Sequence, residues 1–306
     1  QPAEAGPWLL GLDYPRFGPF LLFATLWSVL VYAVLAHWAF GGGWLQAQGT
    51  LDFAGGIPVE MASGFSALAA ALVVGARRDY GRQALLPHNS MYVLLGAGLL
   101  WFGWFGFNGA SYFAAKGAGF SFLTTTLSAS GALLTWCLIE WFRDGKPTAV
   151  GAATGAVAGL VGITPAAGFV YMPQALLIGV VTATACYIAV QVKAAIQFDD
   201  SLDAYAVHGV GGTVGALLTG ALAAPALVPA DYFPKSAEIL AAGGNGALFV
   251  AHVKAVLISY GFVGVGTAVI LWIVGAVVGL RVTPEEEERG LDFVAHGEEA
   301  YDPMTY

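Results

Sequence analysis

Charged residues are scarce in this chain of 306 residues, because Asp, Glu, Lys and Arg together make up only 10% of it. A typical soluble domain carries about 25%. With 58% hydrophobic residues and a mean hydropathy of +0.71, the chain has too little polar surface to cover a soluble fold. This scarcity excludes a soluble enzyme and indicates an integral membrane protein.

Cysteine is also rare, and clusters of basic residues are absent. Cys137 and Cys186 both lie inside apolar runs, which argues against a disulfide framework or a cysteine-based metal site. No basic patch is interleaved with aromatic residues, so nucleic acid is not an expected partner. No metal, nucleotide or redox cofactor is indicated.

Long apolar windows are abundant instead, and a spanning helix needs about 20 such residues. The sequence therefore predicts an all-α, polytopic membrane helical bundle. The eight predicted spans cover approximately residues 18–40, 58–76, 91–114, 120–142, 148–165, 173–196, 204–224 and 253–280. The longest predicted loop runs from Pro225 to His252 and connects the last two spans.

Charge asymmetry sets the expected orientation of this bundle. If residue 1 lies in the cytoplasm, nine of the twelve Lys and Arg residues fall in inner segments. The positive-inside rule then places both termini in the cytoplasm. The segment 285–306 carries eight acids and one base, so we expect a membrane domain over 1–284 followed by an acidic cytoplasmic tail.

Glycine is frequent, at 42 residues, and much of it recurs at intervals of four. Small residues at that spacing let helix backbones approach closely in lipid. We interpret most of them as packing positions. The repeats are Gly151, Gly155 and Gly159, then Gly211 with Gly215, and Gly275 with Gly279.

Ionisable groups within apolar segments mark candidate functional sites, because burying them in a membrane is costly. Asp52 directly precedes the second span, where a carboxylate can cap the helix and, compatibly with that role, favour cations at a pore mouth. Glu60 lies eight residues further on, about 12 Å deeper along a helix. His208 lies early in the seventh span, and a carboxylate beside its imidazole would fix the tautomer and allow proton exchange.

An aromatic stripe is the third feature. Trp104, Phe107 and Ser111 are spaced to share one helical face. Such a stripe is commonly a packing surface, but aromatic faces also attract cations. Ser111 adds a hydrogen-bond acceptor at the same end.

Taken together, these segments resemble the ammonium transporter (Amt/Mep/Rh) family, and most closely its bacterial Amt branch. The similarity extends in order over almost the whole chain and reaches the tail. The stretches that carry it are 36–38, 41–43, 51–56, 103–108, 159–166, 203–212, 289–292 and 296–301.

The resemblance implies an eleven-span inverted repeat that assembles as a homotrimer in the cell membrane. It implies channel-like passage, in which ammonium is recruited at an outer vestibule, loses a proton and crosses a hydrophobic pore as ammonia. By position, Asp52 matches the family's aspartate at the pore mouth and His208 matches its second pore histidine. Phe40 takes the place of a vestibule tryptophan, while Trp104, Phe107 and Ser111 match recruitment and pore-lining residues.

Two departures from the family pattern stand out. Glu60 occupies the position where most members carry the first pore histidine, and we expect it to take over part of the proton relay. The chain also begins near the family's fourth span, so the counterparts of the first three spans, with the outer phenylalanine gate, are not in it.

Two other functions are compatible with parts of this pattern. An ammonium sensor would bind the ion with little or no conduction. An intramembrane hydrolase would need a nucleophile, and no Ser or Cys is placed by a motif. In relatives, the matched tail is a docking site for a cytoplasmic PII-type signal protein, whereas here it is expected at least to pack across the inner face of the trimer.

Overall fold

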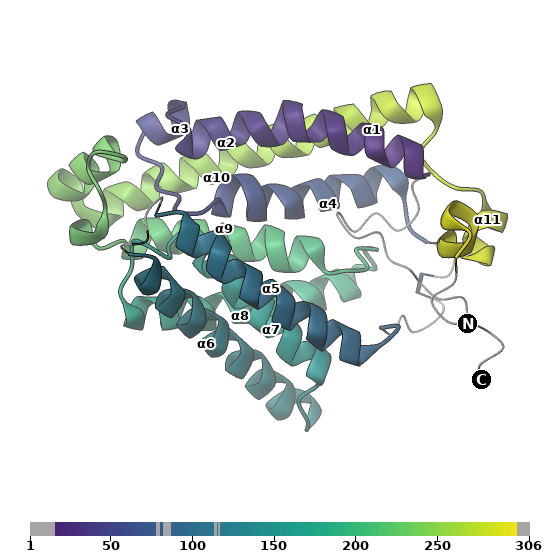
Figure 1. Ribbon diagram of the computed structural model, residues 1–306, viewed down its shortest axis with the longest axis horizontal. Helices are drawn as coiled ribbons and strands as arrows, with labels where there is room; N and C mark the ends of the chain where they lie inside the picture. The colour runs from purple at the N-terminus through teal and green to yellow at the C-terminus, as the bar shows by residue number, and fades with distance from the viewer. Residues whose placement is uncertain (1–15, 78–79, 82–86, 113–114, 116, 299–306) are drawn as a thin grey trace.

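The computed structural model describes residues 16–77, 80–81, 87–112, 115 and 117–298. Every regular element in this part of the chain is helical (Figure 1). Four short π-helical segments and one 3₁₀ turn interrupt or extend the α-helices. In chain order the elements are α1 Phe17–Trp27, η1 Ser28–Tyr32, α2 Ala33–Phe40, α3 Trp44–Ala47, η2 Gly56–Met61, α4 Ala62–Val74, α5 Ser90–Ala110, α6 Ala118–Asp144, α7 Ala149–Ile163, α8 Met172–Ala195, η3 Tyr205–Gly209, α9 Val210–Leu222, η4 Pro225–Leu227, α10 Pro234–Val278, α11 Pro284–Arg289 and η5 Asp292–His296.

Over the described residues all eight predicted spans coincide with helices, although they differ in length; residues 113 and 114 of the window 91–114 lie outside the described part of the chain. Six helical segments of the described chain are long and apolar enough to cross a membrane. The windows 148–165 and 204–224 form shorter helices, and α7 has only 15 residues, about 22 Å. Most of α7 is buried between its neighbours, so this helix forms part of the centre of the bundle.

The prediction of a long loop over 225–252 was wrong. Helix α10 begins at Pro234 and runs for 45 residues, with a kink at Gly244. Glycine-rich sequence around the kink suggested a loop, but Gly244 uses its freedom to adopt φ 65° and ψ −166° while helix continues on both sides. The Asn245 amide holds this corner by donating to the Ala223 carbonyl at 2.9 Å.

Glycines bring several helices into backbone contact, as their spacing predicted. A Cβ at Gly159 would lie 2.5 Å from the Ser128 carbonyl on α6, so no larger residue fits there without movement. Gly215 on α9 packs in the same way against the backbone of Gly162 on α7. The Gly275–Gly279 repeat differs, because Gly279 has open space around it and instead ends α10 with φ 72°.

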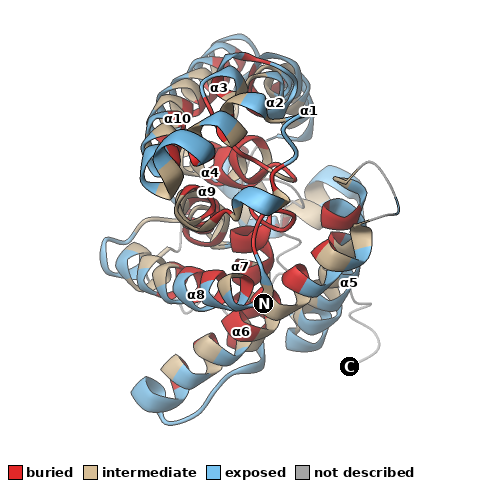
Figure 2. Cartoon of the chain, turned by 90° about the vertical axis from the view of Figure 1, so that its left-hand side faces the viewer, coloured by how far each residue is buried: buried red, intermediate tan, exposed pale blue. Residues whose placement is uncertain are grey.

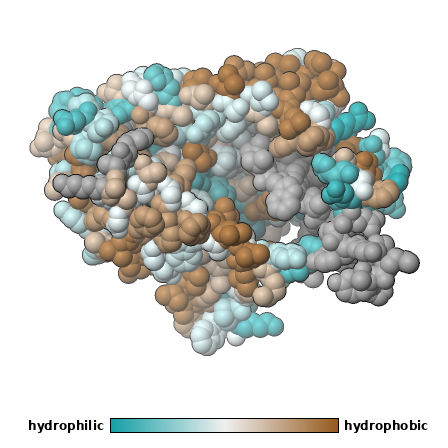
Figure 3. Space-filling model, viewed as in Figure 1, coloured by the Kyte–Doolittle hydropathy of each residue, from teal (hydrophilic) through white to brown (hydrophobic). Residues whose placement is uncertain are grey.

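Burial and hydropathy follow the pattern of a bundle in lipid. Buried residues gather on the inner faces of α4, α7 and α9 (Figure 2). Hydrophobic residues cover the surface over α1 and along α5 (Figure 3). In α5, only 6% of the most apolar window is buried, so nearly the whole helix presents apolar side chains outward.

Candidate functional site: a carboxylate–imidazole pair between two π-helical segments

The two predicted pore residues meet in the centre of the bundle. Nδ1 of His208 lies 2.8 Å from Oε2 of Glu60, within hydrogen-bond distance. The Glu60 side chain is 4% exposed and the His208 side chain is 32% exposed. The carboxylate is therefore enclosed, while part of the imidazole remains accessible.

Glycine contacts between the two helices allow this pair to form. Gly64 on α4 packs so closely on Gly209 that a Cβ would overlap the Gly209 backbone. Gly212 is similarly close to the η2 backbone, where a Cβ would lie 2.7 Å from the Met61 nitrogen. Because both backbones approach within such short distances, the short Glu60 side chain reaches the imidazole.

Asp52 fixes the start of the segment that carries Glu60. Its Oδ1 accepts hydrogen bonds from the amides of Gly55 at 2.9 Å and Gly56 at 2.8 Å, and its Oδ2 accepts from Ile57 at 2.8 Å. The side chain is fully buried. These contacts favour the capping role that the sequence left open, since both carboxylate oxygens are engaged by backbone amides.

A second aspartate, Asp200, does the same for the segment that carries His208, and sequence reasoning did not identify it. Its carboxylate accepts from the amides of Ala204 at 3.0 Å and Tyr205 at 2.8 Å. Burial raises the pKa of Asp200, against the opposing effect of Lys193. The spacing in the sequence could have identified Asp200, because it precedes His208 by eight residues, just as Asp52 precedes Glu60.

The aromatic stripe of α5 divides into a buried and an accessible part. Trp104 is 8% exposed and donates its indole N–H to the Thr164 hydroxyl at 2.9 Å. It belongs to a cluster that includes Val207, the neighbour of His208. Phe107 is 37% exposed and meets the Trp104 ring edge-on. The Ser111 hydroxyl donates to the Phe107 carbonyl at 3.0 Å.

The predicted vestibule residues lie on the side of the molecule where Asp52 begins its helix. Phe40 is 39% exposed and its ring faces Gly55. The Phe53 ring contacts Tyr112, just beyond Ser111, with centroids 5.0 Å apart. The end of α5 and the Asp52 turn therefore meet at one end of the bundle.

The model of the Ammonium Transporter Family matches residues 12–301 of the chain. The chain belongs to the ammonium transporter family. It is 44% identical over 294 residues to an ammonium transporter of Bacillus subtilis (strain 168), covering 94% of this chain and 69% of that protein. Its fold matches the crystal structure of Saccharomyces cerevisiae Mep2 with a TM-score of 0.82 and 37% identity, covering 95% of this chain and 66% of that one.

The chain also matches a structure described as a sensor Amt protein. The TM-score is 0.85 at 30% identity, and the match covers 94% of this chain and 73% of that chain. The chain thus spans about two thirds of the length of several relatives. Proteins described as transporters and a protein described as a sensor share this fold.

The described part of the predicted tail is anchored to the helical bundle. Arg281 donates to the Ala76 carbonyl at 2.9 Å and pairs with Glu287 at 3.2 Å. Thr283 and Glu286 form a capping box at the start of α11. The last part of the predicted tail, 299–306, lies outside the described residues.

Proposed function

We propose that this ammonium transporter family member passes ammonium across the membrane along a path that runs through the Glu60–His208 pair. The observation that carries the proposal is the 2.8 Å contact between an enclosed carboxylate and a partly exposed imidazole. Ionisable groups at such a position in a membrane bundle are a functional site by default.

The chemistry of the pair suits the removal of a proton from ammonium. An ionised Glu60 accepts a hydrogen bond from Nδ1–H of His208, which leaves Nε2 with a free lone pair. Nε2 then accepts a hydrogen bond or a proton from ammonium. Moving an ion into an apolar pore is far more costly than moving neutral ammonia. Potassium has no proton to lose, so this step also gives selectivity.

Recruitment is proposed at the end of the bundle where Phe40 and Phe107 are accessible. Their ring faces attract cations. Trp104, which packs in one cluster with Val207, is the residue we propose to line the path between this entrance and the pair, and Ser111 lies at the C-terminal end of the same helix. Asp52 contributes by holding the backbone that carries Glu60, and its negative charge favours cations near the entrance.

The assembly and topology inferred for the family complete the proposal. We infer a homotrimer in the cell membrane with both termini in the cytoplasm. Residues 1–284 form the membrane domain, and 285–306 form the acidic cytoplasmic tail. A PII-type signal protein is the proposed cytoplasmic partner, and the attachment of α11 through Arg281 would transmit its docking to the bundle.

Ammonium-evoked current and internal pH in proteoliposomes test the proposal. We expect saturable transport by the wild type, loss of transport in His208→Ala and a shifted pH profile in Glu60→Gln. Glu238→Gln is the matched control, because Glu238 is exposed and pairs only with Lys235 in the described structure. An unchanged rate and pH profile in Glu60→Gln would contradict a proton-relay role for Glu60.

The likeness to a sensor Amt protein supports a second candidate, an ammonium receptor with little conduction. Calorimetry on the same variants distinguishes the two functions. Saturable binding that is lost in His208→Ala, without transport by the wild type, would favour the sensor.

A further inference from the structure

The segment between α3 and η2 carries Asp52, and the residues on either side of this aspartate are tied to different parts of the bundle. The Phe53 amide donates at 3.1 Å to the carbonyl of Pro165, which follows α7. The Leu51 amide donates at 3.2 Å to Nε2 of His252, which lies on α10. Because the segment itself forms neither helix nor strand, these two bonds hold its backbone in place.

The contact between Leu51 and His252 is fully buried, since both residues are enclosed. The imidazole also packs against α9 at Gly220, where a Cβ would lie 3.0 Å from Cγ of the ring. The place of the ring is therefore fixed by α9 and α10 before it meets the Asp52 segment. A buried amide that loses its acceptor has no water to replace it, so this hydrogen bond is costly to break.

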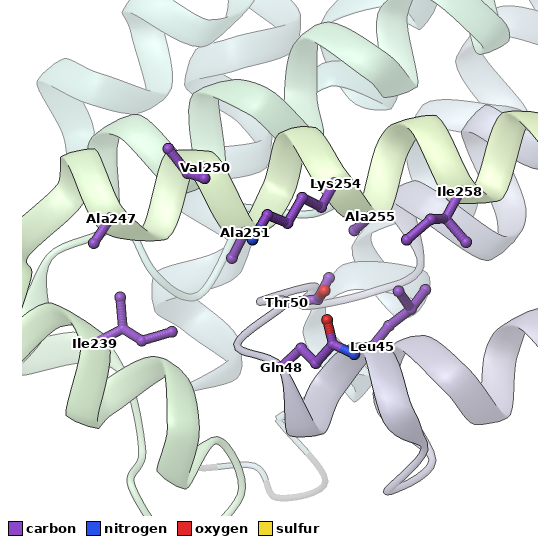
Figure 4. A pocket seen from close by; sticks show the side chains of 10 residues that line it. All are labelled: Leu45, Gln48, Thr50, Ile239, Ala247, Val250, Ala251, Lys254, Ala255 and Ile258. Carbon is purple, nitrogen blue, oxygen red and sulfur yellow. The ribbon is translucent and has the colours of Figure 1, made fainter.

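Side-chain packing beside this contact is incomplete. A cavity of about 150 Å³ lies between the turn after α3 and helix α10 (Figure 4). Thr50 and Ala251, the chain neighbours of Leu51 and His252, both line it. One water molecule occupies only ~30 Å³ in the liquid, so side chains do not close this space. The position of Leu51 relative to α10 therefore depends strongly on the hydrogen bond to His252.

The same hydrogen bond defines the protonation state of the imidazole. An amide N–H donates only to a ring nitrogen that carries no proton, so His252 is neutral with its proton on Nδ1. His208 differs, because it meets the Glu60 carboxylate and its side chain is partly exposed. An enclosed imidazole that accepts a backbone amide is suited to holding a segment of chain, and not to exchanging a proton with a passing ion.

We propose that His252 is a positioning residue for the entrance of the ammonium path. By holding Leu51 it keeps Asp52 in place, and the Asp52 carboxylate in turn accepts the amides that begin η2. The inference rests on the proposed function, in which ammonium is recruited at this end of the bundle. Loss of the imidazole acceptor would let the aspartate leave the position at which its charge favours a cation.

The proton-transfer step is expected to depend less on His252 than recruitment does. The segments that carry Glu60 and His208 are held together by backbone contacts such as that of Gly64 with Gly209. These contacts do not include His252. A substitution that frees the Asp52 segment should therefore raise the KM for ammonium and leave kcat nearly unchanged.

Initial rates of ammonium-evoked current in proteoliposomes, measured over a range of ammonium concentrations, test the proposal. His252→Leu removes the acceptor, and we expect it to raise KM about tenfold, the factor that corresponds to one net hydrogen bond. His252→Gln places an amide oxygen where Nε2 stands and should restore a KM near that of the wild type. His252→Asn has the same amide one methylene short of Leu51, so it should resemble His252→Leu and replaces that variant if it does not fold.

Thr267→Val is the matched control for a loss of stability. Thr267 is a buried residue of the same helix, fifteen positions further on, and its hydroxyl accepts the Trp27 indole N–H at 3.0 Å. Its substitution removes a buried hydrogen bond of α10 without touching the Asp52 segment. We expect it to lower the melting temperature and to leave KM unchanged.

Three outcomes would overturn the proposal. The first is an unchanged KM in His252→Leu with only a lower maximal rate, as expected of a residue that merely supports the fold. The second is a KM in His252→Gln as high as in His252→Leu, and the third is an equal rise in Thr267→Val. A wild type without saturable transport would instead contradict the proposed function. The Kd for ammonium from calorimetry then replaces KM in the same comparison, and the same three outcomes decide.

Discussion

Replacing Asp52 by asparagine is expected to lower the stability of the protein in addition to its transport rate. The Asp52 carboxylate accepts three backbone amides at 2.8–2.9 Å at the start of η2. Asparagine has the same shape but offers one acceptor oxygen instead of two. Its NH₂ group would face the Ile57 amide, so two donors would be opposed in a fully buried site.

The size of the effect follows from these contacts. A hydrogen bond to a charged group contributes about 1.5–3 kcal/mol, and an unsatisfied buried amide costs about 1–3 kcal/mol. Removing a buried negative charge returns part of this loss, because burial of the carboxylate is itself unfavourable. We therefore expect Asp52→Asn to lower the free energy of unfolding by about 2–3 kcal/mol. Asp52→Ala, which loses all three contacts, should lower it further.

Thermal melts of the solubilised protein, read beside transport in proteoliposomes, separate the two roles of Asp52. His208→Ala is the control, because it changes the proposed path without removing a backbone cap. A melting temperature for Asp52→Asn equal to that of the wild type, with transport abolished, would refute the reasoning. That result would mean that Asp52 acts by contacting the cation directly.

Three further predictions concern other parts of the molecule. Arg77→Ala leaves Asp199 buried and unpaired, since both side chains are at most 7% exposed, and should cost about 3–5 kcal/mol in chemical denaturation. Burial raises the pKa of Asp200 above its ordinary value of 3.8, so folding favours the protonated carboxyl. The resulting stability is fully present below pH 3.8 and is lost as the pH rises through the pKa of the folded state. Thermal melts of Asp200→Asn should therefore depend less on pH than those of the wild type. Gly244→Ala places a residue with a Cβ at φ 65° and should lower the free energy of unfolding by about 1–3 kcal/mol in the same melts.

Much of the fold followed from hydropathy, because a membrane span is set by length and composition alone. The close approach of Glu60 and His208 also followed, since each is an ionisable residue in an apolar segment that needs a polar partner. The kink of α10 could not be predicted from the sequence. A glycine at position 244 is equally compatible with a loop and with a bent helix. The bent helix is favoured by the contacts of Asn245 with the end of α9, which the sequence does not reveal.

Asp200 was missed for a different reason. Three acids in the segment 199–203 look like a solvated loop, and the sequence does not reveal that one of them is buried against a helix start. Lys193 on α8 pairs with Asp203 and donates to the Asp200 carbonyl, while Arg77, just after α4, pairs with Asp199. The partners of these acids lie on other elements of the fold, which a local pattern does not show.

The two halves of the site share one construction with different chemistry at its centre. In each half an aspartate accepts backbone amides, a π-helical segment follows, and the residue eight positions on points to the other half. Glycine contacts between α4 and η3 set the separation of these segments independently of the side chains. A change at position 60 therefore leaves the scaffold in place and alters only the partner that His208 meets. This explains how Glu60 is accommodated at a position where the resemblance to the family leads us to expect a histidine, with its carboxylate 2.8 Å from the imidazole.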